Sequence, residues 1–462
     1  MMFSFSPFAI VTLFILLFLI IKNGFSVVLI VNLIIFNLLL EIAKPRGYFL
    51  QIGNGEYYCE DAISVISLFI TIIFIFKNKI SLAIFRLLSL ALFIAVCGLL
   101  LEIIFPLEEK ILNPSIPGGW DAYVAGNAQK SYVQINYVRF ALFVCQLLYF
   151  FSVCSIVIKY VDSRVFEYIC KKIVFFSRFI LLAAFIDFLF KYFLDSKLFY
   201  DSLSLLLGEG LNTYKFDDLR NGELLLQGIT REPSHFAYSL FCISIFFYIQ
   251  GKVEKRKSEI FFILLSFFLM WLSGAFSSVL YSTCFILFVL IYGKLSENSK
   301  NIHVYSLIFT FLILCFVIVL FAISSTNSDN EILSRINNIR TAFLFIIEDD
   351  WRGRFAIASE YVRFISIIDT VRDFVNKPLF GIGAGVELAH SGVITFLTNF
   401  GILGMLVWWL SLIKISSNKR GSNILLLLLV ILPNFLIGFY STLLSVFPIV
   451  ISNVYLLNKN NN

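Results

Sequence analysis

Charged side chains are scarce in this sequence. Asp, Glu, Lys and Arg make up only 14% of its 462 residues, whereas 59% are hydrophobic. Soluble domains carry about a quarter of charged residues, so this shortage excludes an ordinary soluble protein. Many runs of about 20 apolar residues, long enough to cross a bilayer as helices, follow one another. The sequence therefore predicts an all-α polytopic membrane protein.

Paired cysteines are missing as well. The chain has eight Cys and three His but no CxxC motif, so neither a zinc site nor a disulfide framework is indicated. We expect no metal and no cofactor. The net charge of +6 comes from short loops and does not indicate nucleic-acid binding. The apolar N-terminus has no small-residue cleavage site, and we expect it to be a retained helix.

The apolar runs predict twelve or thirteen membrane-spanning helices in a single integral-membrane domain, residues 1–462. They fall near 6–21, 26–43, 61–77, 80–105, 139–159, 173–194, 235–250, 259–275, 277–293, 303–323, 391–413, 424–440 and 442–457.

Lys and Arg predict how these helices are oriented. They concentrate in three short loops, at 159–172, in "GKVEKRKSE" and in "KISSNKRGS", which the positive-inside rule places in the cytoplasm. Alternation then puts 106–138, 195–234 and 324–390 outside. The last of these loops has apolar residues at helical spacing, which predicts short amphipathic helices along the membrane face.

The stretch "TREPSHFA" is the first candidate site. Proline favours the first turn of a helix, so Pro233 marks a helix start and Glu232 its cap. The positive end of the helix dipole and Arg231 then favour an anion such as phosphate. Glu232 and His235 place a proton acceptor beside it, and His235 is expected to contact the substrate. The alternative is a capped helix with a local Arg–Glu pair.

The second candidate is "DDWRGRF". Arg352 and Arg354 can grip phosphate oxygens in two-point fashion, and Trp351 offers a flat face for a sugar or a lipid headgroup. The alternative is that Asp349 and Asp350 neutralise these arginines on a wet surface, where such pairs contribute little.

The third candidate follows Pro378. Gly381, Gly383 and Gly385 predict a flexible loop that leads to His390, at the mouth of the next helix. The glycine spacing does not fit a dinucleotide fingerprint. Within that helix the GxxG pair Gly401 and Gly404 favours close packing of a neighbour.

All three candidates fall on the outer face of the predicted topology. Such a convergence of Arg, Glu and His suits a membrane-bound phosphate ester. Each close Arg–phosphate pair offers about 4 kcal/mol before desolvation at an effective dielectric of 20, so several are needed to hold a diphosphate.

Two passages resemble the bacterial O-antigen polymerase family, which is related to the O-antigen ligases. They are "REPSHFA" and "NKPLFGIGAGVELAHSGVITFLTNFGILG", and the helix plan with a large late outer loop is similar too. "LSGAFSSVLYS" stands where many members have a Ser-Arg pair, and here the Arg is missing.

The resemblance implies a metal-independent glycosyltransferase in the bacterial cytoplasmic (inner) membrane. It would polymerise oligosaccharide units linked to polyprenyl (undecaprenyl) diphosphate into O-antigen, capsule or exopolysaccharide. Arginines would bind the diphosphate, and His390 or Glu232 would accept the proton of the acceptor hydroxyl. A chain-length regulator and a flippase would be partners.

Two other functions stay open. A ligase uses similar motifs but delivers the glycan to a lipid A core. A transporter of polysaccharide or lipid-linked glycan belongs to another class, and it should hold ionisable groups near the membrane midplane.

Overall fold

A computed structural model describes the following parts of the chain. The described residues are 3–45, 47–52, 55–78, 83–106, 108–110, 130–132, 137–160, 163–208, 219–220, 223–224, 226–254, 258–273, 277–296, 341, 344, 367–368, 370–383 and 392–416.

Helices dominate this part, as the composition predicts. They are α1 (Pro7–Asn23), α2 (Val27–Ala43), α3 (Cys59–Lys77), α4 (Ala83–Ile104), α6 (Tyr137–Tyr160), α7 (Ser163–Tyr192), α8 (Leu198–Leu207), α9 (Pro233–Glu254), α10 (Ser258–Leu272), α11 (Ser277–Ser296) and α16 (Gly392–Ser416). Three stretches among the described helices are long and apolar enough to cross a membrane: Cys59–Lys77, Phe140–Val157 and Arg164–Tyr192. The predicted spans 303–323, 424–440 and 442–457 lie outside the described residues.

One predicted boundary is wrong. The segment 159–172 was expected to be a basic loop, but α7 already begins at Ser163. Its lysines do not prevent a helix, because Lys171 and Lys172 lie on an exposed face. Cys170 lies on the opposite face and is fully buried.

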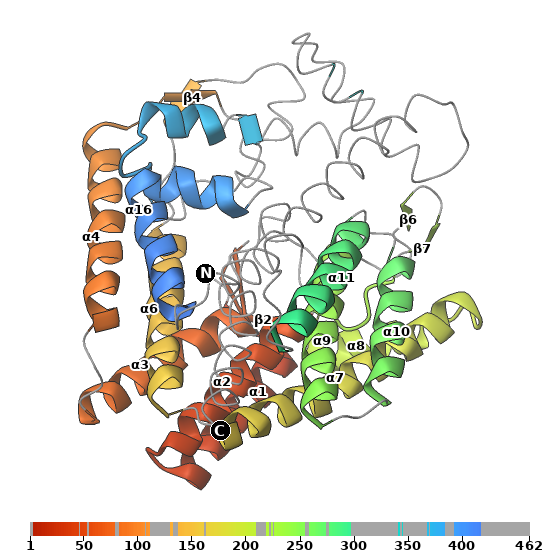
Figure 1. Cartoon of the computed structure of the whole chain (residues 1–462). Coiled ribbons are helices and arrows are strands. Elements are labelled where there is room, and N and C mark those ends of the chain that lie inside the picture. The colour runs from red at the N-terminus through yellow and green to blue at the C-terminus, as the bar shows by residue number, and fades with distance from the viewer. Residues whose placement is uncertain are drawn as a thin grey trace.

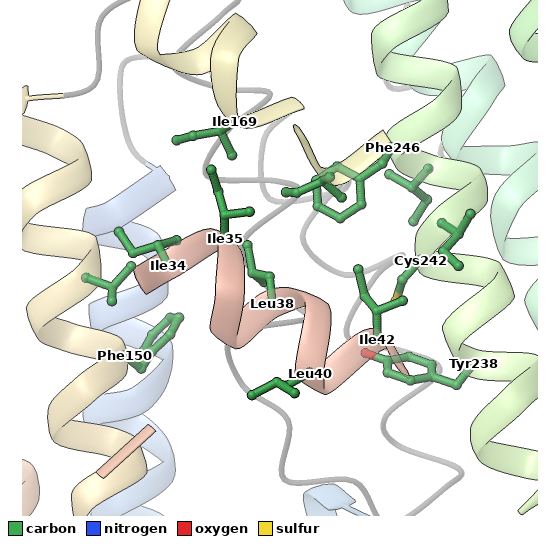
Figure 2. Packing of buried hydrophobic residues seen from close by; sticks show 14 of the residues in the cluster. Ile34, Ile35, Leu38, Leu40, Ile42, Phe150, Ile169, Tyr238, Cys242 and Phe246 are labelled. Atoms are coloured by element: carbon green, nitrogen blue, oxygen red, sulfur yellow. The ribbon is translucent and has the colours of Figure 1, made fainter. Parts of the chain in front are cut away.

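Helix α2 lies at the centre of the bundle. It contacts α1, α3, α7 and α9 and thereby connects two groups of helices, with α4, α6 and α16 on one side and α9, α10 and α11 on the other (Figure 1). In Figure 2, Ile34 lies toward Phe150 of α6, and Ile42 lies toward Tyr238 and Cys242 of α9. The apolar surface of α2 is buried on several sides, which explains its nearly continuous run of Leu and Ile.

A polar contact also joins α2 to its neighbours. The Nδ2 atom of Asn37 donates to Oγ of Ser67 in α3 at 2.8 Å and to the hydroxyl oxygen of Tyr149 in α6 at 3.0 Å. Such hydrogen bonds hold helices together where the surroundings are apolar.

Short strands occupy the connections, a feature that the all-α prediction omits. β1 (Phe3–Phe5), β2 (Tyr48–Ile52) and β3 (Gly55–Tyr58) form an antiparallel sheet in that order. β4 (Glu108–Lys110) pairs with β5 (Lys130–Tyr132), and β6 (Leu219–Arg220) pairs with β7 (Glu223–Leu224). Because β3 runs directly into α3, the first sheet covers the end of the bundle where α2 stops and α3 starts.

The glycine segment after Pro378 is packed rather than flexible over its described residues. The N–H of Ile382 donates to the carbonyl of Thr398 at 2.9 Å, and that of Ile402 donates to the carbonyl of Pro378 at 2.8 Å. A Cβ on Gly381 would lie 2.2 Å from the Thr398 oxygen. The backbone contact therefore requires glycine and holds the segment against α16.

Helix α16 is broken where this segment meets it. Gly401 has φ 66° and ψ −173°, so the helix is interrupted there. The expected GxxG pair thus does not lie on one continuous helix. Close approach is nevertheless observed, because a Cβ on Gly401 would lie 2.3 Å from the Leu379 oxygen.

Candidate functional site

The candidate site lies where α2 ends and α3 and α9 begin. Pro233 is the first residue of α9, as predicted, and the carbonyl of Glu232 accepts the N–H of Phe236 at 3.0 Å. The preceding residues are tied to the end of α2: Pro45 and Thr230 form a β-bridge, and the N–H of Arg231 donates to the carbonyl of Lys44 at 3.2 Å. This backbone pairing fixes the entry of the chain into α9.

Arg231 is buried and already has partners. Its guanidinium forms an ion pair with Glu60 at the start of α3 and stacks on the ring of Tyr58, with Cζ 3.5 Å from the ring centroid. The side chain is 9% exposed, so it does not project into open water. Its partner is Glu60, 171 residues away, rather than the neighbouring Glu232 of the local-pair alternative.

Four charged residues gather at this point: Lys44, Glu60, Asp61 and Arg231, here called the α2–α3–α9 cluster. Burial, reinforced by the positive charge of Arg231, lowers the pKa of Lys44 to about 7, although nearby carboxylates raise it. For Arg231 burial also disfavours the charge, but Glu60, Tyr58 and Asp61 outweigh it and hold its pKa above the ordinary value. Arg231 is thus the permanent cation of the cluster, whereas the charge of Lys44 changes near neutrality.

A fourth helix joins the cluster through Asp61. Nε2 of Gln146 in α6 donates to Oδ1 of Asp61 at 2.6 Å. The cluster therefore connects α2, α3, α6 and α9 at one end of an otherwise apolar bundle.

Glu232 and His235 lie next to this cluster and are more accessible. Oε2 of Glu232 lies 3.9 Å from Nε2 of His235 and accepts a hydrogen bond from Oγ of Ser234 at 3.1 Å. The Glu232 side chain is 36% exposed, compared with 17% for His235. An accessible carboxylate beside an imidazole is able to accept a proton from a hydroxyl group.

Asp187 holds the turn that leads into the site. Its Oδ2 accepts the N–H of Gly228 at 2.9 Å and lies 3.7 Å from Nζ of Lys191. Gly228 has φ 54°, and a Cβ there would lie 3.3 Å from Ala184 of α7. Through these contacts with the turn at Gly228, the last turns of α7 fix the position of Arg231 and Glu232, which follow that turn in sequence.

The sequence predictions cover only part of this site. Arg231, Glu232 and His235 are brought together, whereas Trp351, Arg352, Arg354 and His390 lie outside the described residues. The role of His390 as an alternative proton acceptor therefore stays a prediction.

Sequence reasoning missed Lys44, Glu60 and Asp61. The available signal was the pair of acids in "YYCEDA", which interrupts the start of an apolar run. Within the described residues no group of three or more His, Cys, Asp or Glu side chains is placed to hold a metal ion.

Comparison of the chain with protein-family models, with curated protein sequences and with solved structures gives no match.

Proposed function

We propose that this chain is a membrane-embedded polymerase of oligosaccharide units linked to polyprenyl diphosphate. The observation that carries the proposal is the α2–α3–α9 cluster with the Glu232–His235 pair beside it, at one end of an apolar bundle. A substrate with a lipid tail and a charged diphosphate needs this combination of an apolar body and a polar end. The sequence resemblance to O-antigen polymerases supplies the reaction class.

The reaction is a glycosyl transfer. A hydroxyl oxygen of the acceptor unit attacks the anomeric carbon of the donor glycan and forms the new C–O bond. The bond from that carbon to the diphosphate oxygen breaks, and polyprenyl diphosphate leaves with the electron pair. The hydroxyl proton goes to a base of the chain, Glu232 or His390. No nucleotide sugar takes part, in keeping with a chain that has no Asp-x-Asp motif.

The described contacts refine the roles of the arginines. For Arg231 to bind a diphosphate directly, the anion has to compete with Glu60 for a buried guanidinium. We therefore assign Arg231 chiefly to holding the start of α9, so that Glu232 and His235 face the substrate. Arg352 and Arg354, with Trp351, are the proposed ligands of the diphosphate and its sugar.

The proposed location is the bacterial cytoplasmic membrane, crossed by twelve or thirteen helices, with the cluster at the outer face. The distribution of basic residues supports this orientation. Lys252 lies in the last turn of α9, at the end opposite the cluster, and begins the basic "KVEKRKSE" segment that the positive-inside rule places in the cytoplasm.

A transporter is less well supported by the described helices. The buried carboxylates of the long helices are Glu60, Glu102, Asp187 and Glu259. Each lies within the first or last two turns of its helix. A carrier that couples charge movement to transport is expected to hold such groups near the midplane. A ligase uses the same residues, so it is separated from a polymerase by its acceptor.

The test is turnover of the purified protein in liposomes with a synthetic lipid-linked repeat unit. A polymerase yields a ladder of longer glycans on the polyprenyl lipid. A ligase yields product only when a lipid A core is added, and a transporter yields movement without new bonds. Absence of any longer glycan under all conditions would contradict the proposed function.

Glu232→Gln is the sharpest variant because it keeps size and capping ability and removes only the negative charge. If Glu232 is the base, we expect the rate to fall by roughly 10²-fold or more, with donor binding retained. Glu167→Gln, the same change near the start of α7, is the control and should be silent. If Glu232→Gln is silent too and His390→Ala abolishes transfer, the base is His390.

Arg352→Lys and Arg354→Lys test the diphosphate ligands. Each keeps a positive charge and loses the two-point fork, so weaker donor binding with an intact fold is expected. Normal ladders from the double Arg→Ala variant would show that both are surface charges only.

A further inference from the structure

The short helix α8 is held at both ends by the ends of two apolar helices. At its start, the connection from α7 is tight, with the N–H of Leu194 donating to the carbonyl of Leu189 at 3.2 Å and that of Ser196 donating to Phe190 at 3.0 Å. At its end, a Cβ on Gly208 would lie 2.9 Å from Cβ of Ser6, the N-cap of α1.

A second contact fixes the end of α8. A Cβ on Gly47, which precedes strand β2, would lie 1.7 Å from the carbonyl oxygen of Leu207. The two backbones therefore touch directly. The ten residues of α8 span about 15 Å, so the helix runs from the end of α7 to the beginning of α1. Helix α8 therefore lies beside the end of α7 and the beginning of α1.

The surface of α8 has three sectors. Tyr200 is buried against the bundle. Three leucines point outward with large exposed fractions: Leu198 at 64%, Leu205 at 79% and Leu206 at 65%. At 100° per residue they share, with Ser202, an arc of about 100°. The remaining exposed arc holds Lys197 and Asp201. Apolar and charged side chains are thus separated on the exposed surface itself.

The apolar arc continues onto neighbouring apolar surface. Phe193 and Leu194, in the connection from α7, are 71% and 60% exposed. On α1 the exposed apolar side chains start one turn after its first residue, with Ile10, Val11 and Phe14. Helix α8 contacts both α1 and α7. Exposed apolar side chains thus occur on α1, on the connection that follows α7, and on α8, which contacts both helices.

We propose that α8 lies in the headgroup region of the bilayer, parallel to the membrane plane. Leu198, Leu205 and Leu206 insert among the lipid acyl chains, and Lys197 and Asp201 remain in water. Helices with an apolar face and a separate charged face bind lipid surfaces in this way. The partner is the lipid bilayer itself, because the apolar arc of α8 continues onto the exposed apolar side chains of α1. These side chains extend along the length of α1, as expected of a helix that contacts lipid.

The test is photo-crosslinking of the full-length protein in liposomes made with phospholipid that carries labelled acyl chains. Benzoylphenylalanine, which reacts with nearby C–H bonds, replaces one residue at a time. Phe14 on α1 is the reference for lipid contact, and buried Tyr200 is the reference for none. The decisive pair is Leu206 and Asp201, which point about 140° apart around α8 and are both exposed.

We expect the lipid adduct at position 206 to match that at position 14 and to exceed that at position 201 several-fold. Position 198 should behave like 206, which protects the result against a local effect of one substitution. Equal lipid adducts at 201 and 206, or none at 206 while position 14 reacts, would overturn the proposal. A crosslinked dimer at 206 in place of the lipid adduct would also overturn it, by assigning the apolar arc to a second copy of the chain.

Discussion

Arg231 loses its water shell on folding and depends on the groups that replace it. Glu60 supplies the opposite charge and Tyr58 an aromatic face. Removing one member of a buried ion pair costs more than replacing both, because the remaining charge stays buried without compensation. The stability of the α9 start therefore depends on a pair rather than on either residue alone.

Arg231→Met should destabilise the protein by about 3–5 kcal/mol. The double variant with Glu60→Gln should recover much of that loss. The measurement is thermal unfolding of the purified protein in detergent, analysed as a double-mutant cycle. Lys172→Met is the control, because Lys172 is exposed on α7, and such a surface change should alter stability by no more than about 0.5 kcal/mol. Additive effects of the two substitutions would contradict a coupled pair.

Lys44 makes stability depend on pH near neutrality. Its folded pKa of about 7 lies below its unfolded value of about 10.4. Between these values the unfolded chain binds a proton that the folded protein does not, so stability rises with pH; below about pH 7 both states bind it. The surrounding charges are Arg231, Glu60, Glu41 and Asp61.

Lys44→Met should remove this contribution. We expect the variant to be stabilised relative to the natural chain at pH 6, with the advantage shrinking between pH 7 and pH 10. The full shift corresponds to as much as about 5 kcal/mol. Unfolding temperatures of both proteins across this range measure the difference. Parallel pH profiles would show that Lys44 keeps its proton in the folded state.

The sequence predicts single residues well where the signal is local. Pro233 opens α9 because proline suits a helix start wherever the chain places it. The partner of Arg231 was not predictable in the same way, because Glu60 lies 171 residues away and only the packing of α3 beside α9 brings it close.

At the scale of elements, the break in α16 is the most constrained feature. The segment 378–383 fills the interruption and satisfies backbone groups on both sides of it: the carbonyls of Thr398 and Asn399 and the N–H groups of Ile402 and Leu403. A broken helix in apolar surroundings needs such partners, since unpaired backbone groups are costly there.

Gly401→Ala should be poorly tolerated. The new methyl group would lie 2.3 Å from the Leu379 oxygen, and the positive φ adds roughly 1–2 kcal/mol for any residue with a Cβ. Gly24→Ala is the matched control, since Gly24 also has a positive φ but no heavy atom within 4 Å. Yield and unfolding temperature in detergent measure both. Equal losses in the two variants would show that packing at Gly401 contributes nothing.

The sequence predicts a helix or strand correctly where the length of an apolar run determines it. Prediction fails where contacts with distant parts of the chain determine the structure. Ten of the described helices, α1 to α4, α6, α7, α9 to α11 and α16, overlap predicted spans, because apolar runs of this length have few alternatives to a helix. The strands β1 to β3 were missed because each is only three to five residues long. In addition, β1 pairs with a segment more than 40 residues away, as in Phe3 with Ile52, whereas β2 pairs with the adjacent β3. The loop predicted to be flexible from Gly381 onward is packed against α16 over its described residues 381–383, because glycine at position 381 permits close backbone contact.

At the scale of the whole molecule, the cluster, the three-stranded sheet and the start of α9 share one end of the bundle. The predicted orientation places this end outside the cytoplasm. The same orientation puts 324–390 outside and "GKVEKRKSE" inside.

A cysteine at position 328 tests this orientation. In intact cells Ser328→Cys should react with a membrane-impermeant thiol reagent, because the loop 324–390 is predicted to face outward. Lys255→Cys is the control and should react only after the cells are broken, and the unsubstituted chain sets the background from native cysteines. The reverse pattern would invert the topology and place the cluster in the cytoplasm.

For the molecule as a whole, the sequence predicts the helical class better than the contacts within the candidate site. Charge scarcity and apolar length are properties of composition. The α2–α3–α9 cluster, in contrast, arises from four segments whose polar residues are each unremarkable in their own context: Lys44, Glu60 and Asp61, Gln146, and Arg231.

The distance in sequence between Glu60 and Arg231 has a consequence for biosynthesis. Chains grow at about 5–20 residues per second, so α3 emerges from the ribosome on the order of ten seconds before the arginine that neutralises it. During this interval Lys44 is the only cation of the cluster that has been synthesised, and Glu60 does not yet have its ion-pair partner. The contact that fixes the start of α9 can therefore form only after the first half of the chain has been made.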